Sequence, residues 1–509
     1  MAKPDLKSFF QPANIRWILF ALVICAVYFF AIGTIPLIGP DEPRYAQVAR
    51  EMFERGDWVT PTLGGYNWFE KPALLYWLQI VSYYIFGVSE FSARLGPALC
   101  GLLTVLGLYL FGRKLFDERF ANYLAIVSAS TVGLLVFSRG ASFDIVLTFT
   151  VTGALVCFFI ANESAAKEEE DDFGFFAGFY IFIGLALLAK GLIGIVLPFG
   201  VIAFYLLLTR QFFPVKFLTS LSWGIVVTLM VAAVWYGPVY LRNGQPFVRE
   251  FIINHHFARY LSTVHAHPQP FYFFWLVLPA LTFPWLPFLF SALGRSWKWN
   301  LRRPDSPVDK MRLFAVAWIL FPLLFFSASG SKLPGYILPA LPACCLLIAD
   351  VVVRFIGAGG SGRLRAWLIK GTALATFACV IIALAFLVPG LVKNDTVKYV
   401  LADADARGYN QAQVINLHDT FHSAEFYAAG RLIRNLKDGK QKKFEGVGDI
   451  FRAYQDPLSI DVNHKVVLPA LVLVPPAHLN ELTDNPWFNA TVLAGNEEFL
   501  LISLDSAKQ

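Results

Sequence analysis

The clearest shortage in this 509-residue sequence is charge. Only 15% of its residues are Asp, Glu, Lys or Arg, whereas 57% are hydrophobic. Soluble globular domains carry about 25% charged residues, so the composition argues against a soluble protein. The uncharged sequence is arranged in apolar runs of roughly 20 residues, the length that crosses the hydrocarbon core of a bilayer. The sequence therefore predicts a membrane protein with several spans.

Reactive and nucleotide-binding motifs are also missing. The six cysteines all lie inside apolar runs, and none has the C-x-x-C spacing of a metal or redox site, so we interpret them as small buried hydrophobic residues. There is no P-loop and no G-x-S-x-G elbow. These absences argue against a nucleotide-binding enzyme and against an α/β-hydrolase.

The apolar runs predict a mostly α-helical, polytopic membrane bundle with about 11–13 spans. The run from Ile15 to Leu37 is too long for the core of a signal peptide and has no small-residue cleavage site, so it predicts a retained first span. The short run at 73–88 predicts an interfacial helix or a partial span. The expected spans are 15–37, 92–112, 119–137, 143–162, 174–189, 191–209, 218–240, 272–293, 312–328, 334–353 and 367–390.

The basic residues predict which loops are cytoplasmic. Lys and Arg are enriched in cytoplasmic loops, and they gather at the N-terminus and near 113–119, 210–216, 294–312 and 354–370. With eleven spans, all of these loops fall on one face. The acidic stretch "ESAAKEEEDD" at 163–172 is best interpreted as a solvated turn, because acidic residues contribute little to this rule.

Five polar clusters are expected on the opposite face. They are the segment 39–72, which includes "GPDEPRYAQVAREMFERGDWVTP", and the segments 138–144, 189–191, 254–270 and 329–339. Each alone could be a solvating loop. Together they predict an extracytoplasmic active site at the membrane surface, because ionisable residues within or beside a membrane are costly and usually functional.

The chain after residue 390 loses its long apolar runs. "KVVLPALVLVPP" and "FLLISL" are typical of buried strands, and "FHSAEFYAAGRLIRNL" predicts an amphipathic helix. We therefore expect a transmembrane domain at 1–390, whose first extracytoplasmic loop, 38–90, carries interfacial helices. A small extracytoplasmic α/β domain is expected at 391–509.

A substrate delivered within the membrane fits these observations, because nucleotides are scarce outside the cytoplasm. A polyprenyl-phosphate sugar would need cations at its phosphate, a carboxylate near the reacting carbon and an apolar groove for its chain. The candidate cations are Lys71, Lys190, Arg259 and Lys332, and the candidate carboxylates are Asp41, Glu42, Glu70 and Asp144.

Several of these segments resemble a known family. "GPDEPRYAQVAREMFERGDWVTP", "WFEKPALLYWL", "EFSARLGPALCGLLTVLGLYLFGRKLF", "LLAKGLIGIVLP" and "SKLPGYILPALP" are similar to the 4-amino-4-deoxy-L-arabinose lipid A transferases. More broadly, they resemble the C-type (GT-C) membrane glycosyltransferases related to the dolichyl-phosphate-mannose mannosyltransferases. The resemblance covers roughly residues 15–350, and the tail matches only in position and size.

The resemblance implies an inverting glycosyltransferase of the bacterial inner membrane. It implies transfer of 4-amino-4-deoxy-L-arabinose, or a related amino sugar, from undecaprenyl phosphate to a lipid A phosphate at the periplasmic face. Such lipopolysaccharide modification is linked in the family to polymyxin resistance. The implied partners are the lipid-linked sugar donor, the lipid A acceptor and membrane lipids, with no nucleic acid.

The resemblance also assigns roles to residues. It places Asp41 at the catalytic centre, with Glu42 beside it, and Lys71 with Glu70 in donor-phosphate and metal binding. His256 and Arg259 match the family's E-H-x-x-R-F pattern, but His255 replaces its Glu, which weakens the inference of a metal site from Glu70 and His256. Lys332 and Tyr336 match the K-L-P-x-Y-x-L-P pattern, whose Tyr lies by the donor phosphate.

Structural alternatives exist for most of these side chains. Asp41 or Asp144 could cap the N-terminus of a helix, with Arg139 as the partner of Asp144, and Lys190 could extend to lipid headgroups. Glu70 and Lys71 could pair, but adjacent residues make poor partners, which favours separate roles.

Histidines are concentrated in one stretch of the sequence. His255, His256, His265 and His267 are four of only eight in the chain. They suggest a divalent metal such as zinc as a cofactor, although no cysteine accompanies them.

Other functions remain open. On the same fold, the acceptor could be a protein hydroxyl, as in O-mannosylation, or another envelope glycan. A lipid transporter would show internal repeats and charges at the bilayer midplane, and neither is visible in the sequence. A structural scaffold would not need Asp41, Lys71, Arg259 and Lys332 on one side.

Overall fold

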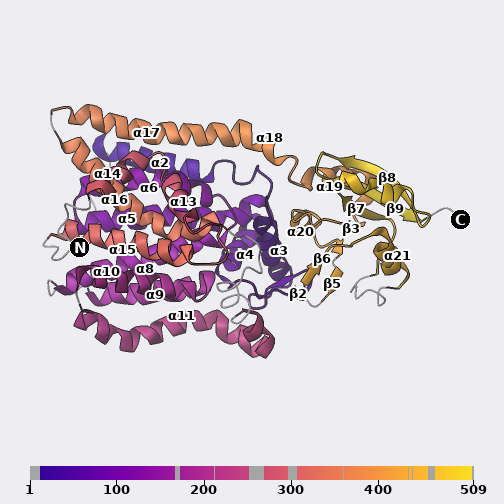
Figure 1. Cartoon of the computed structure of the whole chain (residues 1–509), viewed down its shortest axis with the longest axis horizontal. Coiled ribbons are helices and arrows are strands. Elements are labelled where there is room, and N and C mark those ends of the chain that lie inside the picture. The colour runs from indigo at the N-terminus through magenta and orange to yellow at the C-terminus, as the bar shows by residue number, and fades with distance from the viewer. Residues whose placement is uncertain are drawn as a thin grey trace. The chain divides into compact units, whose positions relative to one another are not determined.

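The structure of the chain is a computed structural model, and it contains two compact units (Figure 1). One unit, called the bundle unit here, comprises Met1–Ile32, Phe69–Leu78 and Arg94–Ile381; the other, called the sheet unit, comprises Gly33–Trp68, Gln79–Ala93 and Ile382–Gln509. Each unit is described by itself. The structure describes residues 12–166, 172–210, 212–251, 269–295, 306–358, 360–433, 435–437, 440–456 and 465–506.

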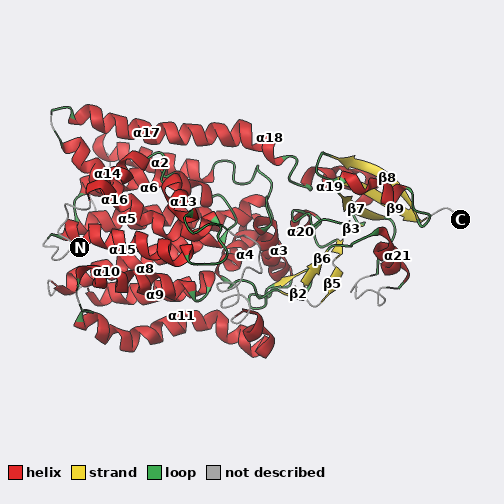
Figure 2. Ribbon diagram, in the orientation of Figure 1, coloured by secondary structure: helices red, strands yellow, loops and turns green. Residues whose placement is uncertain are grey.

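The bundle unit is built from helices (Figure 2). Two of them continue into the sheet unit at one end, namely α4 (Leu74–Phe86) and α5 (Glu90–Leu115). The others are α2 (Pro12–Phe29), α6 (Glu118–Ser130), α7 (Val132–Phe137), α8 (Phe143–Ala166), α9 (Asp172–Lys190), α10 (Ile193–Thr209), α11 (Val215–Phe247), α13 (Phe273–Leu281), α14 (Leu286–Arg295), α15 (Pro307–Ser327), η3 (Pro334–Ala340), α16 (Leu341–Gly357) and α17 (Gly362–Ile382).

Among the described residues, seven helices are long and apolar enough to cross a membrane, or eight if the bent pair α13 and α14 forms one span. This confirms a polytopic helical membrane protein. The expected 11–13 continuous spans are not all present as single long helices. The expected span 119–137 is divided into α6 and α7 at Thr131, whose backbone is extended (φ −70°, ψ 118°). The expected span 272–293 bends by 118° between α13 and α14. Leu19–Phe29, Leu74–Phe86 and Ile193–Thr209 are shorter apolar helices.

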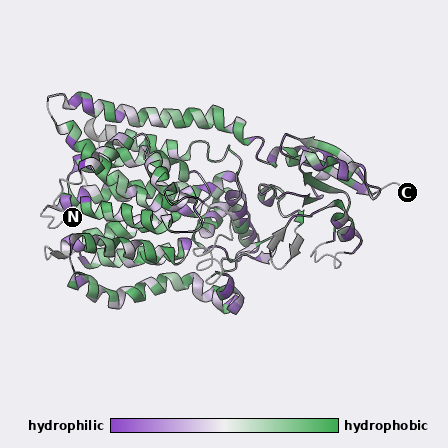
Figure 3. Cartoon of the chain, viewed as in Figure 1, coloured by the Kyte–Doolittle hydropathy of each residue, from purple (hydrophilic) through white to green (hydrophobic). Residues whose placement is uncertain are grey.

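Burial differs sharply among these helices. The span Pro334–Gly357 is 89% buried over its most apolar stretch, whereas Val215–Phe251 is only 28% buried. Exposed side chains of α11 include Leu229, Met230 and Val234, and Figure 3 shows that apolar residues predominate along the long helices. A helix that is apolar all round is expected either in a core or against lipid. We therefore interpret α16 as the centre of the bundle and α11 as a lipid-facing helix.

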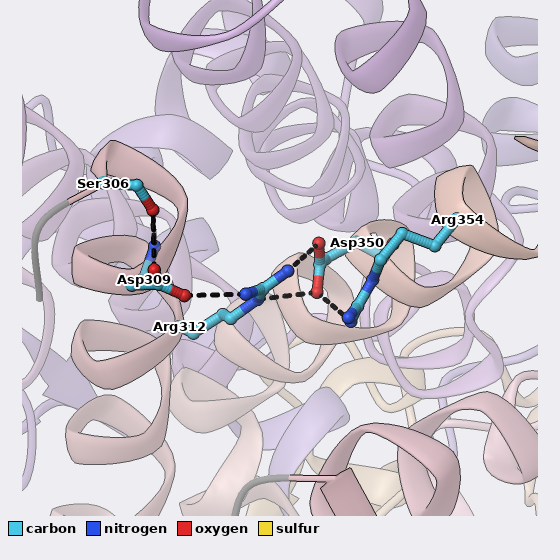
Figure 4. A network of polar contacts seen from close by, with 5 residues as sticks. All are labelled: Ser306, Asp309, Arg312, Asp350 and Arg354. Atoms are coloured by element: carbon cyan, nitrogen blue, oxygen red, sulfur yellow. Dashed lines mark hydrogen bonds and ion pairs between the residues drawn. The ribbon is translucent and has the colours of Figure 1, made fainter. Parts of the chain in front are cut away.

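An ion network joins α15 and α16 (Figure 4). The carboxylate of Asp350 on α16 accepts hydrogen bonds from Nε and Nη2 of Arg312, both at 2.9 Å, and from Nη2 of Arg354. Arg312 also contacts Asp309 at 2.7 Å, and the amide of Asp309 donates to Oγ of Ser306, which caps α15. The side chain of Asp350 is only 8% exposed, so its charge is compensated by two guanidinium groups instead of water.

The sheet unit contains a five-stranded mixed sheet in the order β4-β3-β7-β9-β8. β3 pairs with β4 and β7 in parallel, and β9 pairs with β7 and β8 antiparallel. The strands are β3 (Gln413–Asn416), β4 (Leu432–Ile433), β7 (Ala470–Val474), β8 (Phe488–Gly495) and β9 (Leu500–Ser506), with the small pairs β1 (Thr62–Leu63) and β2 (Tyr66–Asn67), and β5 (Asn435–Lys437) and β6 (Lys440–Lys442). The helices are α3 (Asp41–Glu54), η4 (Ala383–Leu387), α18 (Val388–Val392), α19 (Lys398–Ala404), η5 (Asp405–Tyr409), α20 (Ala424–Tyr427), α21 (Val447–Gln455), η7 (Pro476–His478) and α22 (Leu479–Thr483).

Helices cover both faces of the sheet, which confirms the expected small α/β fold. Alternate residues of a strand point to opposite faces. Ile415 and Val472 pack with Ile450 of α21 on one face, whereas Val414 and Leu471 pack with Leu401 of α19 on the other. The apolar runs "ALVLV" and "LLISL" are therefore buried on both sides, as strands in the middle of an α/β sheet require.

The helix expected over "FHSAEFYAAGRLIRNL" is wrong. Only Ala424–Tyr427 is helical, and the chain then enters β4 and β5. Ala429 (φ 52°) and Gly430 (φ 84°) both adopt the left-handed conformation, which ends a helix. The strand β4 pairs with β3, so tertiary pairing overrides the helical periodicity of this segment.

Candidate functional site

A charged cluster lies where α8 begins and α9 ends in the bundle unit. Lys190, in the last turn of α9, pairs with Oδ1 of Asp144 in the first turn of α8. The ammonium also lies 4.7 Å from the ring centroid of Tyr336 on η3, a cation–π geometry. The side chains of Lys190 and Asp144 are 16% and 19% exposed. Lys190 is therefore held by Asp144 and Tyr336 and is not extended to lipid headgroups.

The backbone around Asp144 fixes its position. Its amide donates to Oγ of Ser142 at 3.1 Å, so Ser142, and not Asp144, bonds the start of α8. Gly335 lies so close that a Cβ there would collide with Oδ2 of Asp144. This close approach explains the glycine in the "KLPGY" segment, because any side chain would displace the carboxylate.

Lys332 is placed just before η3. It is 6% exposed, and its ammonium donates to the carbonyl of Ser329 at 2.6 Å. Nearby, Tyr336 packs against Phe326, with ring centroids 5.8 Å apart. The structure thus brings Tyr336, Lys190 and Asp144 together, and Lys332 lies four residues before Tyr336 on the same connection.

Glu70 and Lys71 contact each other, contrary to the expectation that adjacent residues make poor partners. Lys71 Nζ lies 3.1 Å from Oε1 of Glu70, and the two side chains are 10% and 11% exposed. A charge taken from water needs a compensating partner, which explains why even adjacent residues pair here. The segment is anchored within the bundle unit by two ring contacts, Phe69 with Phe247 and Tyr76 with Phe143.

Arg139 does not pair with Asp144, so that expectation is wrong. Its guanidinium donates to the carbonyls of Val27 at 2.8 Å and of Phe30. Arg94 donates to the carbonyl of Ile32 at 3.0 Å. Both arginines therefore satisfy carbonyl groups at the C-terminal end of α2, where a helix leaves carbonyls unpaired and favours cations.

An apolar groove runs along α5, α8 and α9 within the bundle unit. Its volume is about 670 Å³. Phe149, at one end of its lining on α8, lies five residues after Asp144, or about 7.5 Å along the helix. The lining residues are Leu103, Thr104, Gly107, Leu110, Phe111, Arg113, Lys114, Phe149, Thr152, Gly153, Val156, Cys157, Ile160, Phe175 and Phe182.

Asp41 and Glu42 lie in the first turn of α3 in the sheet unit. The cap position is Pro40, so Asp41 is not the N-cap. Oδ1 of Asp41 accepts a hydrogen bond from Arg44 at 2.8 Å, while Oε2 of Glu42 accepts one from the amide of Ile38 at 3.1 Å. Glu42 thus bonds the segment just before α3, and Asp41, 47% exposed, is the better candidate for chemistry.

His422 is a neighbour of Asp41 that the sequence did not indicate. It follows β3 and is half-buried. Burial lowers the pKa of His422, and Arg44 lowers it further, whereas Asp41 and Asp419 raise it. The imidazole is therefore neutral near pH 7, with its Nδ1 buried and without a hydrogen-bond partner among the described residues. Nothing in the sequence links residue 422 to residue 41, because only the fold of the sheet unit places them side by side.

The remaining predicted site residues, His256, Arg259 and His267, lie outside the described residues, as do His255 and His265. The predicted metal pair of Glu70 and His256 therefore stays a prediction.

Replacing Lys190 with Met should lower both stability and activity. The variant leaves the largely buried carboxylate of Asp144 without its cation, which should cost about 1–3 kcal/mol of unfolding free energy. Adding Asp144→Asn should restore the melting temperature, because the uncompensated charge disappears. If Lys190 binds substrate phosphate, sugar transfer stays impaired in the double variant. Recovery of transfer together with stability would show that the pair is only structural.

Comparisons with known proteins give the family. Residues 14–248 match the family model of dolichyl-phosphate-mannose-protein mannosyltransferase. Over 379 residues, 73% of this chain, the sequence is 30% identical to the undecaprenyl phosphate-α-4-amino-4-deoxy-L-arabinose arabinosyl transferase of Yersinia enterocolitica. The protein of the same name from Aeromonas hydrophila is 30% identical over 69% of the chain. The chain belongs to the 4-amino-4-deoxy-L-arabinose transferase family.

Solved structures confirm the fold of this family member. Crystal structures of ArnT from Cupriavidus metallidurans superpose with TM-scores of 0.78 in the apo state and 0.75 with bound undecaprenyl phosphate, at 20% and 23% identity. Each comparison covers 96% of this chain and 98% of the other. The match with the Yersinia relative spans 65% of that protein's length, and the match with the Aeromonas relative spans 63%.

Proposed function

We propose that this protein is an inverting membrane glycosyltransferase. It transfers 4-amino-4-deoxy-L-arabinose, or a related amino sugar, from undecaprenyl phosphate to a phosphate of lipid A at the periplasmic face of the bacterial inner membrane. The observation that carries the proposal is the 30% identity over 379 residues to a protein named for this sugar and this lipid carrier.

The bundle unit supplies features that this donor requires. The apolar groove of about 670 Å³ suits part of a prenyl chain. Lys190, at the end of α9, and the buried Lys332 offer positive charge for a phosphate. Lys71 is proposed to neutralise the charge that develops on the departing undecaprenyl phosphate, an electrostatic contribution that is usually large in catalysis. Tyr336 is proposed to lie by the donor phosphate, as the family resemblance implies.

Asp41 is proposed as the catalytic carboxylate. In the reaction, the bond between the sugar carbon C1 and the donor phosphate oxygen breaks, and a bond from C1 to an acceptor oxygen forms on the opposite face. A phosphate acceptor is already anionic at neutral pH and needs little deprotonation. Asp41 would therefore orient the acceptor or stabilise positive charge on the sugar ring. Glu42 is the second carboxylate of this proposal, and Arg259 a further phosphate ligand.

Mass spectrometry of lipid A from cells with and without the protein tests the proposal. We expect a mass increment of an aminopentose, or of a hexosamine for a related donor, that depends on the protein and disappears with Asp41→Asn. Unchanged lipid A in cells that contain the folded protein would contradict the lipid A acceptor.

A protein acceptor is the second candidate, because the matching family model is that of a protein mannosyltransferase. It predicts glycosylated envelope proteins, with lipid A unchanged, in the same cells. Glycoproteomics of the envelope fraction separates the two acceptors. A periplasm-only reporter fused to Gln509 tests the proposed orientation, and activity only in a cytoplasmic reporter would contradict it.

A further inference from the structure

Two histidines and a glutamate meet at one edge of the sheet in the sheet unit. Nε2 of His418 lies 2.9 Å from Oε2 of Glu481, and Nδ1 of His478 lies 3.1 Å from Oε1 of the same carboxylate. The two imidazole rings are stacked, with centroids 3.9 Å apart and planes inclined by 24°. One donor atom from each residue lies within 4.8 Å of the other two.

The topology of the sheet explains why these residues meet. His418 follows β3, and His478 follows β7, and these two strands are parallel neighbours. The chain leaves β3 toward β4 on one side, whereas β7 has its other neighbour, β9, on the opposite side. In open α/β sheets, ligands bind in the crevice at the carboxyl ends of strands where the strand order reverses in this way.

Local backbone structure orients the three side chains. The amide of His418 donates to the carbonyl of Phe444 at 2.9 Å, and its own carbonyl accepts a hydrogen bond from Lys443. His418 adopts a left-handed backbone (φ 62°), which is uncommon for a residue with a side chain. His478 and Glu481 are three residues apart at the start of α22, so both lie on the same side of that turn.

Hydrogen bonding alone is a poor explanation for this arrangement. Hydrogen bonding would require one exposed carboxylate to order two stacked rings, with a hydrogen on each ring nitrogen that faces Glu481. A cation would order all three groups at once, because imidazole nitrogens and a carboxylate oxygen can all donate lone pairs to it. Zinc–nitrogen and zinc–oxygen bonds of about 2.0–2.2 Å at tetrahedral angles place ligand atoms roughly 3.4 Å apart. Small side-chain rotations would bring the ligand atoms of the three residues to this spacing.

We propose that His418, His478 and Glu481 form a binding site for a divalent transition-metal cation, with zinc as the ion that fits the ligand set. Two imidazoles and one carboxylate fill three positions of a tetrahedral zinc site and leave the fourth for water. The ion joins the loop after β3 to the loop after β7. These three residues are not those of the predicted pair Glu70 and His256, and the proposal does not depend on the proposed transferase activity.

Zinc binding to the purified full chain tests the proposal. The protein in detergent is first stripped with a chelator and then titrated with zinc against a chromophoric competitor. We expect wild type to bind one more equivalent than the variants His418→Asn and His478→Gln, and Glu481→Gln to bind this equivalent at least tenfold more weakly. Asn is chosen at 418 because it tolerates the left-handed backbone.

Two controls keep the result interpretable. His464→Gln removes another histidine of the chain while His418, His478 and Glu481 stay unchanged, and this variant should bind zinc as wild type does. The melting temperature of each variant without zinc should match that of wild type, and Glu481→Gln, whose side chain is 43% exposed, decides the question if a histidine variant fails to fold. Equal zinc stoichiometry and affinity in wild type and in the folded variants would overturn the proposal.

Discussion

Replacing Asp41 with Asn should lower the rate of sugar transfer by about 10²–10³-fold, the usual loss when a group that stabilises transition-state charge is removed. The variant keeps the shape of the side chain but removes its negative charge. Stability should change by about 1 kcal/mol or less, because Asp41 is half-exposed and contributes a partly exposed ion pair with Arg44 and a favourable charge at the start of α3. The measurement is transfer from a lipid-linked donor in reconstituted vesicles, together with the melting temperature of the same preparation.

The other end of the same helix offers a matched control. Glu54 pairs with Arg50 at 2.7 Å and is 51% exposed, much as Asp41 pairs with Arg44 at 2.8 Å and is 47% exposed. Glu54→Gln therefore removes an equivalent carboxylate from an equivalent ion pair on α3. It should leave transfer unchanged. Equal rates for both variants and wild type would contradict a catalytic role for Asp41.

Replacing Asp350 with Ala should lower the free energy of unfolding by about 3–5 kcal/mol, the usual cost of removing one partner of a buried ion pair. The variant leaves Arg312 and Arg354 without the carboxylate that compensates both of them (Figure 4). Arg312 keeps its contact with Asp309, which is 29% exposed. Denaturation of the purified protein in mixed detergent micelles measures the difference.

A second ion pair in the bundle unit serves as the comparison for this loss of stability. Asp172 pairs with Lys216 at 2.7 Å, but Lys216 is 47% exposed, so Asp172→Asn should cost no more than about 1 kcal/mol. Combining Asp350→Leu with Arg312→Leu should recover much of the lost stability, because the uncompensated charge and its desolvation are removed together. A small effect of Asp350→Ala, equal to that of Asp172→Asn, would show that the network contributes little.

Local sequence signals indicated the polar segments of the chain but not how their side chains pair. The segments around Lys71, Asp144, Lys190 and Tyr336 were recognised because charged residues interrupt apolar runs, which is a local property of the chain. The partner of Asp144 was predicted wrongly. Arg139 is five residues away in sequence, yet it is drawn to the carbonyl groups at the end of α2, while Lys190 reaches Asp144 from the end of α9.

The C-terminal region, 391–509, shows more clearly that local patterns were predicted and long-range pairing was not. Its buried strands were predicted because apolar runs in a strand must be covered on both faces, and β7 and β9 are found where expected. The helix over 421–436 was predicted from a periodic pattern, but pairing of Leu432–Ile433 with β3 stabilises a strand there instead. Such pairing depends on residues far along the chain, so periodicity within the segment could not reveal it.

The sequence by itself determined that this protein is a helical membrane protein with a small α/β region, because apolar length and strand-like runs are local and their burial has few solutions. The tertiary structure alone decided that Lys190 pairs with Asp144 over Tyr336, that His422 lies by Asp41, and that His418, His478 and Glu481 meet at one sheet edge. These contacts join residues up to several hundred positions apart. Their geometry follows from how helices and strands pack, and the local patterns of a single sequence do not specify that packing.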